Sequence, residues 1–253
     1  MAERSDFSGK RVLVTGGSGD IGSAMCAAFA RAGAKVAFTW FVSHTGRDAV
    51  TAAIEEAGGE ALPIRVNLRD PAAAKEVSEA VQAAWGGVDV FISNAATGVL
   101  KPAMDLKEKH IQAVMSVNAH AFLRLAQKLA PGMPPGGRLI ALTSAGATRA
   151  LSHYASIGAS KAALESLVRH LAVELGPQGI TVNALCPGVV DTRALVHFPN
   201  REEILAMARA RTPTGRIATP ADAADVALFL ASPAAAMING QTITVDGGYS
   251  ILA

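Results

Sequence analysis

The sequence predicts a single α/β domain built on a doubly wound, seven-stranded parallel sheet flanked by helices. Seven short apolar runs alternate with segments of helical spacing along the 253 residues. Each run is almost continuously apolar, which is typical of strands buried on both faces of a parallel sheet. Because crossovers between parallel strands are right-handed, helices are expected on both faces. No linker or break in composition divides the chain, so one domain over residues 1–253 is expected.

The expected strands are justified in order by these apolar runs. They lie at residues 11–15, 35–40, 61–66, 88–93, 138–144, 180–185 and 241–245. Segment 162–175 shows the helical pattern most clearly, since its apolar residues recur every three or four positions. The least regular region is 187–220, which is rich in proline and glycine. A loop of that length in a compact domain is more often functional than idle.

Composition excludes several classes of protein. The 23 Lys and Arg nearly balance 21 Asp and Glu, so there is no basic footprint for nucleic acid or a membrane surface. Two cysteines, Cys26 and Cys186, make no disulfide framework and favour a reducing compartment. The N-terminus lacks an apolar segment and no long apolar stretch occurs, so a cytoplasmic location is expected. The six histidines show no metal-ligand spacing, and no metal is expected.

A glycine-rich loop, Thr15–Gly22, follows the first expected strand and leads into a helix expected over 23–32. Glycines let the backbone turn sharply and approach a pyrophosphate, which then lies on the helix N-terminus. A tight strand–helix turn is the plainer alternative, but the position after the first strand favours a dinucleotide site of Rossmann type. The candidate contacts are Gly16, Ser18, Gly19, Asp20, Ile21 and Gly22.

The end of the second expected strand bears on the choice of cofactor. Residues 38–41 contain no carboxylate, although NAD-selective sites place one there to bind the ribose hydroxyls. His44 and Arg47 come next and are candidates for binding a 2′-phosphate, unless they only form a solvated helix start. The sequence therefore favours NADPH, with NADH not excluded.

Together and in this order, these features resemble the short-chain dehydrogenase/reductase family. The loop resembles the family's TGxxxGxG pattern, except that Asp20 stands at the middle glycine. Asn94 and Ala95 match the turn that borders the adenosine ribose. The resemblance also implies cofactor contacts from Asn67, Leu68, Lys161, Pro187, Gly188, Val190 and Thr192.

The catalytic signature departs from the family's usual YxxxK. Lys161 matches the family, but Ile157 stands four positions before it, and Tyr154 precedes the lysine by seven. Ser144 keeps its register relative to Lys161, although it could simply cap a strand end. Asn118 matches the asparagine of the family's proton relay. The resemblance thus implies Tyr154, Lys161, Ser144 and Asn118 as catalytic residues, with Lys161 lowering the pKa of the tyrosine.

The displaced tyrosine has a chemical meaning. In a ketone the oxygen is on the carbon that receives hydride, whereas in an enoyl thioester the charge develops on an oxygen about 2.5 Å further away. Three helical residues correspond to about 4.5 Å, a displacement of the right size. Tyr-x6-Lys is the signature of the enoyl-acyl-carrier-protein reductases within this family, and residues 10–252 resemble the NADPH-dependent FabL type.

The resemblance therefore implies an NADPH-dependent enoyl-thioester reductase in fatty acid or related acyl biosynthesis. The alternatives are a 3-oxoacyl-thioester (ketone) reductase of the same family and a non-catalytic dinucleotide-binding module. The substrate would be an acyl thioester of acyl carrier protein or coenzyme A. Segment 193–215 would be a lid over the acyl chain, with Arg201, Arg209 and Arg211 available to an acidic carrier, unless it is an ordinary surface helix. Helix 155–175 and residues 246–252 resemble the surfaces of self-association, so a homotetramer is expected.

Overall fold

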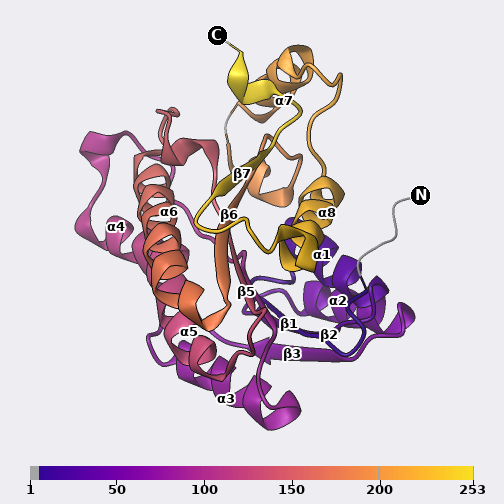
Figure 1. The fold of residues 1–253 in the computed structure, drawn as a ribbon. Coiled ribbons are helices and arrows are strands. Elements are labelled where there is room, and N and C mark those ends of the chain that lie inside the picture. The colour runs from indigo at the N-terminus through magenta and orange to yellow at the C-terminus, as the bar shows by residue number, and fades with distance from the viewer. Residues whose placement is uncertain (1–5, 199, 253) are drawn as a thin grey trace.

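The computed structural model describes residues 6–198 and 200–252 (Figure 1). A seven-stranded, all-parallel sheet runs through the molecule in the order β3-β2-β1-β4-β5-β6-β7. The strands are β1 (Arg11–Val14), β2 (Lys35–Trp40), β3 (Ala61–Arg65), β4 (Val90–Ser93), β5 (Arg138–Leu142), β6 (Thr181–Pro187) and β7 (Thr242–Val245). The order reverses between β1 and β4, and such a switch point opens a crevice at the carboxyl ends of the strands. The predicted Rossmann-type fold is confirmed.

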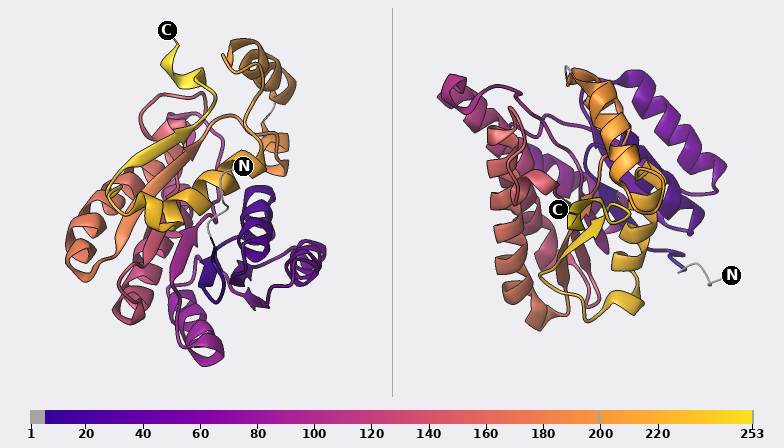
Figure 2. Two further views of the ribbon diagram at one scale, coloured as in Figure 1. Left: turned by 45° about the vertical axis from the view of Figure 1, so that its right-hand side comes forward. Right: turned by 90° about the horizontal axis from the view of Figure 1, so that it is seen from above.

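Helices cover both faces of the sheet (Figure 2). The helices are α1 (Asp20–Arg31), α2 (His44–Glu56), α3 (Ala73–Trp85), α4 (Glu108–Met115), α5 (Ala121–Leu129), α6 (Ala155–Leu175), α7 (Arg201–Arg211) and α8 (Pro220–Ala231), of which α7 lies beyond the end of the sheet and not on a face. Successive residues of β1 point to opposite faces: Val12 and Val14 pack with α1, α2 and α8, and Leu13 packs with α3, α5 and α6. The strands are apolar on both sides because each face has its own core.

Several element boundaries differ by one to three residues from the sequence prediction, and two of these differences shape the crevice. Helix α1 begins at Asp20, three residues before the expected start, because the glycine loop makes its turn within residues 15–19. Strand β5 ends at Leu142, where its ladder with β6 ends. Thr143 and Ser144 therefore leave the sheet at its carboxyl edge.

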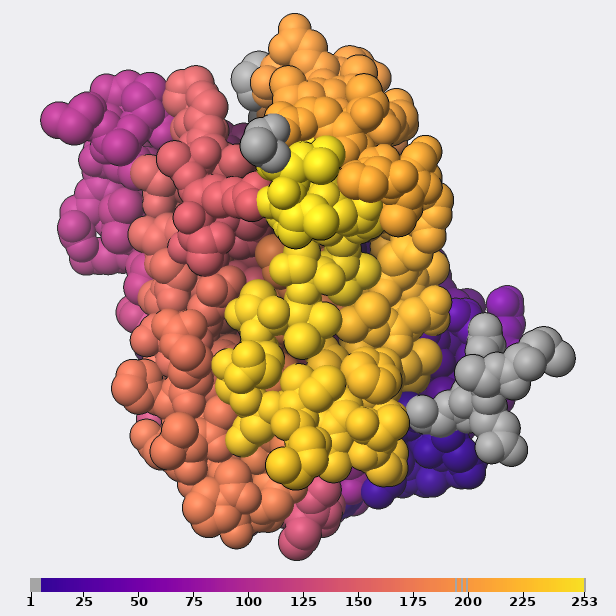
Figure 3. Space-filling view, turned by 45° about the horizontal axis from the view of Figure 1, so that its top comes forward, coloured from indigo at the N-terminus to yellow at the C-terminus, as the bar shows by residue number. Residues whose placement is uncertain are grey.

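The irregular region after β6 lies over this edge. It contains a short 3-10 helix, Arg193–His197, followed by α7. The space-filling view shows the C-terminal residues lying between the segment around residue 150 and the region of α7 (Figure 3). Two contacts hold them there: Arg149 donates to the carbonyl of Ser250, and the guanidinium of Arg211 lies over the ring of Tyr249, 5.7 Å from its centroid. Within the described residues, no helix is both long and apolar enough to cross a bilayer.

Candidate active site

The glycine loop is fastened to the end of β4. The Thr15 hydroxyl accepts hydrogen bonds from the backbone N–H groups of Asn94 (3.0 Å) and Ala95 (3.1 Å). The Asn94 amide donates to the carbonyls of Thr15 (2.9 Å) and Gly16 (3.1 Å). Asn94 and Ala95 therefore hold the loop across the switch point, where the sequence placed them.

Glycine is needed in this loop for two different reasons. Gly16 has φ +66°, and a Cβ built on it would lie 2.9 Å from the Cα of Ala95. A Cβ on Gly22 would collide with the carbonyl of Gly16. Gly19 is less constrained, since an added Cβ would meet only the Gly16 carbonyl at 3.3 Å.

The start of α1 is suited to an anionic group. Its N-cap residue is Gly19, which has no side chain that could accept hydrogen bonds from the N–H groups of the first turn. A pyrophosphate binds to uncapped N–H groups at a helix N-terminus, and glycines beside them allow the anion to approach the backbone closely. Ser18 and Ile21 flank this point, and the chain therefore fits a dinucleotide cofactor here.

The end of β2 carries a cationic cluster built around Trp40. The His44 ring lies edge-on to the indole at 4.8 Å between centroids, and Arg47 lies 5.0 Å from the centroid. Arg65, which pairs with Trp40 in the β2–β3 register, lies 5.4 Å away on the same indole. The sequence analysis missed Arg65. Its place at the last position of β3, beside the end of β2, was the available signal.

The neighbouring loop after β3 has two different environments. Leu68 is buried, and its carbonyl accepts a hydrogen bond from Arg124 at 3.2 Å. Asn67 is exposed and its side chain accepts from the N–H of Arg69 at 3.1 Å. Leu68 thus belongs to the core that the sheet forms with α3, α5 and α6, and Asn67 stabilises the turn beside it.

Tyr154 and Ser144 lie together at this same edge. Tyr154 immediately precedes α6, and its hydroxyl donates to the Ser144 Oγ at 3.2 Å. Its ring packs on Gly146, where any side chain would collide with it. Burial raises the pKa of Tyr154, while the hydrogen bond with Ser144 lowers it by less. The expected lowering by Lys161 is not seen, and the hydroxyl is a protonated donor at neutral pH.

Ile157 fills the position at which the family's signature has tyrosine. It is buried, and its side chain occupies the space that a Cβ on Gly98 would need. This position is therefore an apolar contact between α6 and the loop after β4. The tyrosine of this segment stands three residues earlier, at position 154.

Lys161 is buried two turns into α6. Its Nζ donates to the carbonyl of Leu142 at 2.7 Å, and burial lowers its pKa to about 8. Asn118 lies nearby in a π-helical turn, Ser116–His120, between α4 and α5. Its amide accepts from Thr97 N–H (2.8 Å) and donates to the Thr97 carbonyl (3.0 Å) and the Ser160 Oγ (2.9 Å). Asn118 therefore holds the loop after β4 against α6, next to the lysine.

The loop after β6 closes the other side of the edge. Gly188 donates to the carbonyl of Val245 at 2.9 Å, and a Cβ on it would lie 2.6 Å from the Cβ of Asp246. Val190 forms an isolated bridge with Ala218, and Thr192 precedes the 3-10 helix. Cys186, just before Pro187, is buried with its pKa raised to about 11, so it is an inert thiol rather than a nucleophile.

The segment expected as a lid contributes an aromatic ring to the site. The Phe198 ring lies 6.4 Å from that of Tyr154, between centroids. Arg201 forms ion pairs with Asp191, at 2.7 Å, and with Glu202. Arg201 is thus paired with Asp191, and the guanidinium of Arg211 lies over Tyr249, while the availability of Arg201, Arg209 and Arg211 to a carrier protein stays a prediction.

Fold and site together define a dinucleotide-dependent oxidoreductase with a tyrosine, serine and lysine at the carboxyl edge of its sheet. A family model described as "Enoyl-(Acyl carrier protein) reductase" matches residues 17–250. The chain belongs to the short-chain dehydrogenase/reductase family.

Individual relatives within this family have different substrates. The chain is 36% identical to 1-cyclohexenylcarbonyl-CoA reductase of Streptomyces collinus, over 95% of this chain and 87% of the relative. It is 34% identical to 7alpha-hydroxysteroid dehydrogenase of Escherichia coli K12, over 95% and 94%. Among solved structures, a short-chain dehydrogenase from Burkholderia cenocepacia in complex with NADP superposes with a TM-score of 0.89 at 35% identity, covering 96% of this chain and 99% of that one. L-sorbose reductase from Gluconobacter frateurii, complexed with NADPH and L-sorbose, superposes with a TM-score of 0.91 at 27% identity, covering 99% and 100%.

Proposed function

We propose that the protein reduces the α,β double bond of a trans-2-enoyl thioester, with hydride from NADPH delivered to the β carbon, in fatty acid or related acyl biosynthesis. One observation carries this proposal. Ile157 puts an apolar side chain where a ketone reductase of this family would have its hydroxyl donor, and Tyr154 supplies a hydroxyl three residues earlier. The donor has moved in the way that a conjugated thioester requires, because the negative charge develops away from the carbon that receives hydride.

Each residue then has a distinct task. Tyr154 donates a hydrogen bond to the thioester oxygen, and its protonated state at neutral pH suits that role. In the free protein Ser144 accepts the tyrosine proton; with substrate bound, that proton would turn to the thioester oxygen and the Ser144 hydroxyl would donate to the tyrosine oxygen, which keeps the phenol oriented. Lys161 binds the nicotinamide ribose. Asn118 holds the loop after β4 against α6, beside Lys161. NADPH would supply the hydride to the β carbon, and a proton from solvent would complete the reduction at the α carbon.

The preference for NADPH rests on the cluster around Trp40. Arg47 and Arg65 place cationic groups at the end of β2, with the His44 ring beside them, where no carboxylate is present to bind a 2′-hydroxyl. The relatives from Burkholderia cenocepacia and Gluconobacter frateurii were solved with NADP and NADPH. The glycine loop and residues 67–68, 94–95, 187–188, 190 and 192 would complete the cofactor site.

An acyl thioester of coenzyme A or of acyl carrier protein is the substrate class we propose. The Streptomyces relative is named for a CoA thioester whose ring double bond is conjugated with the carbonyl. Residues 193–215 would cover the acyl chain, and the contact between Phe198 and Tyr154 puts an apolar ring of this segment beside the donor.

We also propose a homotetramer acting in the cytoplasm. Ala155, Ala159 and Ala162 expose an apolar face of α6, and a cavity of about 330 Å³ lies between them and the segment around residue 150. A second copy of the chain would cover this concave face in a symmetric assembly. The free, buried thiols of Cys26 and Cys186 suit a reducing compartment.

The test is to measure NADPH oxidation with crotonyl-CoA and with acetoacetyl-CoA, using the parent chain and Tyr154→Phe. We expect the parent to reduce crotonyl-CoA preferentially, and Tyr154→Phe to lower that turnover by about 10²–10³, the usual cost of one preorganised donor to an oxyanion. Tyr249→Phe changes the only other tyrosine, on the C-terminal segment, and should keep parental turnover. Preference for acetoacetyl-CoA would assign the ketone reductase instead. NADPH binding without turnover of either thioester would favour the non-catalytic module.

A further inference from the structure

Arg193 joins two parts of the cofactor crevice that are far apart in the chain. Its backbone N–H donates to one carboxylate oxygen of Asp20 at 2.6 Å, and its Nε donates to the other at 2.7 Å. A terminal nitrogen of the same guanidinium donates to the carbonyl of Ser18 at 2.9 Å. These three hydrogen bonds, from Arg193 to Asp20 and Ser18, hold the segment that follows β6 against the glycine loop, and we call them the Arg193 clasp.

Asp20 is unusual at this place for an electrostatic reason. It is the first residue of α1, where a carboxylate is favoured by the helix dipole. The same helix terminus is where the proposed cofactor would place its pyrophosphate, which is also anionic. An unpaired Asp20 would repel that group, whereas an Asp20 paired with Arg193 presents little net charge to it.

We propose that Arg193 is a cofactor-positioning residue: paired with Asp20, it cancels the carboxylate charge at the pyrophosphate site and fastens the lid segment 193–215 over it. This inference rests on the proposed use of a nicotinamide dinucleotide. Since Arg193 is the first residue of the 3-10 helix that leads towards α7, its clasp couples binding at the glycine loop to the order of the lid.

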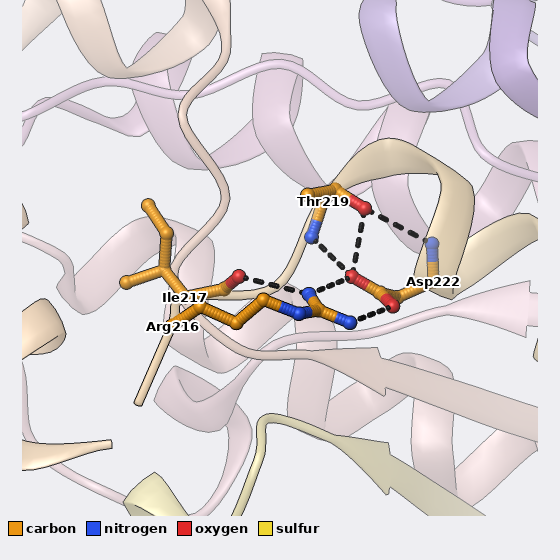
Figure 4. A network of polar contacts seen from close by, with 4 residues as sticks. All are labelled: Arg216, Ile217, Thr219 and Asp222. Carbon is orange, nitrogen blue, oxygen red and sulfur yellow. Dashed lines mark hydrogen bonds and ion pairs between the residues drawn. The ribbon is translucent and has the colours of Figure 1, made fainter. Parts of the chain in front are cut away.

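The chain contains a matched control pair. Arg216 forms a fork with Asp222 at 2.6 and 2.7 Å, and the carboxylate also accepts from Thr219 at the N-cap of α8 (Figure 4). Side-chain exposure is 62% and 26% in this pair, against 64% and 26% for Arg193 and Asp20. The two pairs are equally solvated, but neither partner of Arg216 belongs to the glycine loop.

The experiment compares Arg193→Ala, Asp20→Asn, the double variant and Arg216→Ala by titration with NADPH, followed through the fluorescence of the bound nicotinamide at low ionic strength. We expect Arg193→Ala to raise Kd by about three- to tenfold, because it leaves Asp20 unpaired. Asp20→Asn should bind NADPH at least as tightly as the parent, because it removes the carboxylate and leaves the Arg193 guanidinium unneutralised beside the pyrophosphate, and the double variant should bind more tightly than Arg193→Ala alone. Arg216→Ala should keep the parental Kd.

A second readout follows the lid without any turnover. Hydrogen–deuterium exchange of peptides covering 193–211 should fall when NADPH binds to the parent, and should fall less in Arg193→Ala. Parental affinity in Arg193→Ala, or equal weakening in Arg193→Ala, Asp20→Asn and the double variant, would overturn the proposed electrostatic role. Absence of NADPH and NADH binding to the parent itself would instead refute the dinucleotide function.

Discussion

Replacing Lys161 by methionine should stabilise the cofactor-free protein at neutral pH while abolishing cofactor-dependent turnover. Lys161 is 6% exposed, and burial lowers its pKa from 10.5 to about 8. In the unfolded chain the Lys161 amine keeps its proton up to a pH near its ordinary pKa of 10.5, whereas in the native chain it loses the proton above about pH 8. The free energy of unfolding of the parent therefore rises between these two pKa values, and below them the cost of burying the ammonium is fully present.

The size of the effect follows from this pKa and one hydrogen bond. The depressed pKa corresponds to about 3 kcal/mol at neutral pH. Methionine has a similar length, but it leaves the carbonyl of Leu142 without its donor, which costs about 1–2 kcal/mol. We expect Lys161→Met to be more stable than the parent by about 1–2 kcal/mol at about pH 6.5, and this advantage to vanish near about pH 9.5.

Urea unfolding at both pH values measures the difference directly. Lys35→Met is the control, because its ammonium is 43% exposed and forms an ion pair with Glu60, also exposed. That control should show no gain at either pH. A Lys161→Met protein that is as stable as the parent or less so at about pH 6.5 would show that the buried ammonium costs nothing, and would refute the reasoning.

Three further outcomes are expected. Arg47→Ala and Arg65→Ala should each raise the KM for NADPH by about tenfold and leave the KM for NADH unchanged. The control Lys75→Ala, in an exposed ion pair on α3, should alter neither KM. Equal changes for both cofactors would remove the 2′-phosphate assignment. Asn118→Ala should lower the free energy of unfolding in urea by about 2–4 kcal/mol, because it leaves both backbone groups of Thr97 without their partner; a loss below about 1 kcal/mol would mean that the loop finds other partners. Light scattering at micromolar concentration should give the mass of a tetramer, and a monomer mass would contradict the proposed assembly.

Much of this protein follows from local patterns in the sequence. The strands are buried on both faces, so they are apolar runs that can be recognised without knowing their neighbours. The glycine loop is equally local, because the collision between a side chain at Gly22 and the carbonyl of Gly16 arises within one turn. The distances along the chain between Ser144, Tyr154 and Lys161 are also visible without a structure, and they led to the proposed reaction.

The tertiary structure decided which side chains meet. Arg193 and Asp20 are 173 positions apart, and their clasp depends on how the loop after β6 passes over the start of α1. Arg65 reaches Trp40 only through the β2–β3 register, and the space for Ile157 exists only because Gly98 faces α6. The sequence did not show that Asp191, ten positions earlier, pairs with Arg201. The physical reason is that periodicity determines which face of an element is buried, whereas partners, burial and the resulting pKa of Tyr154 or Lys161 depend on packing between distant segments.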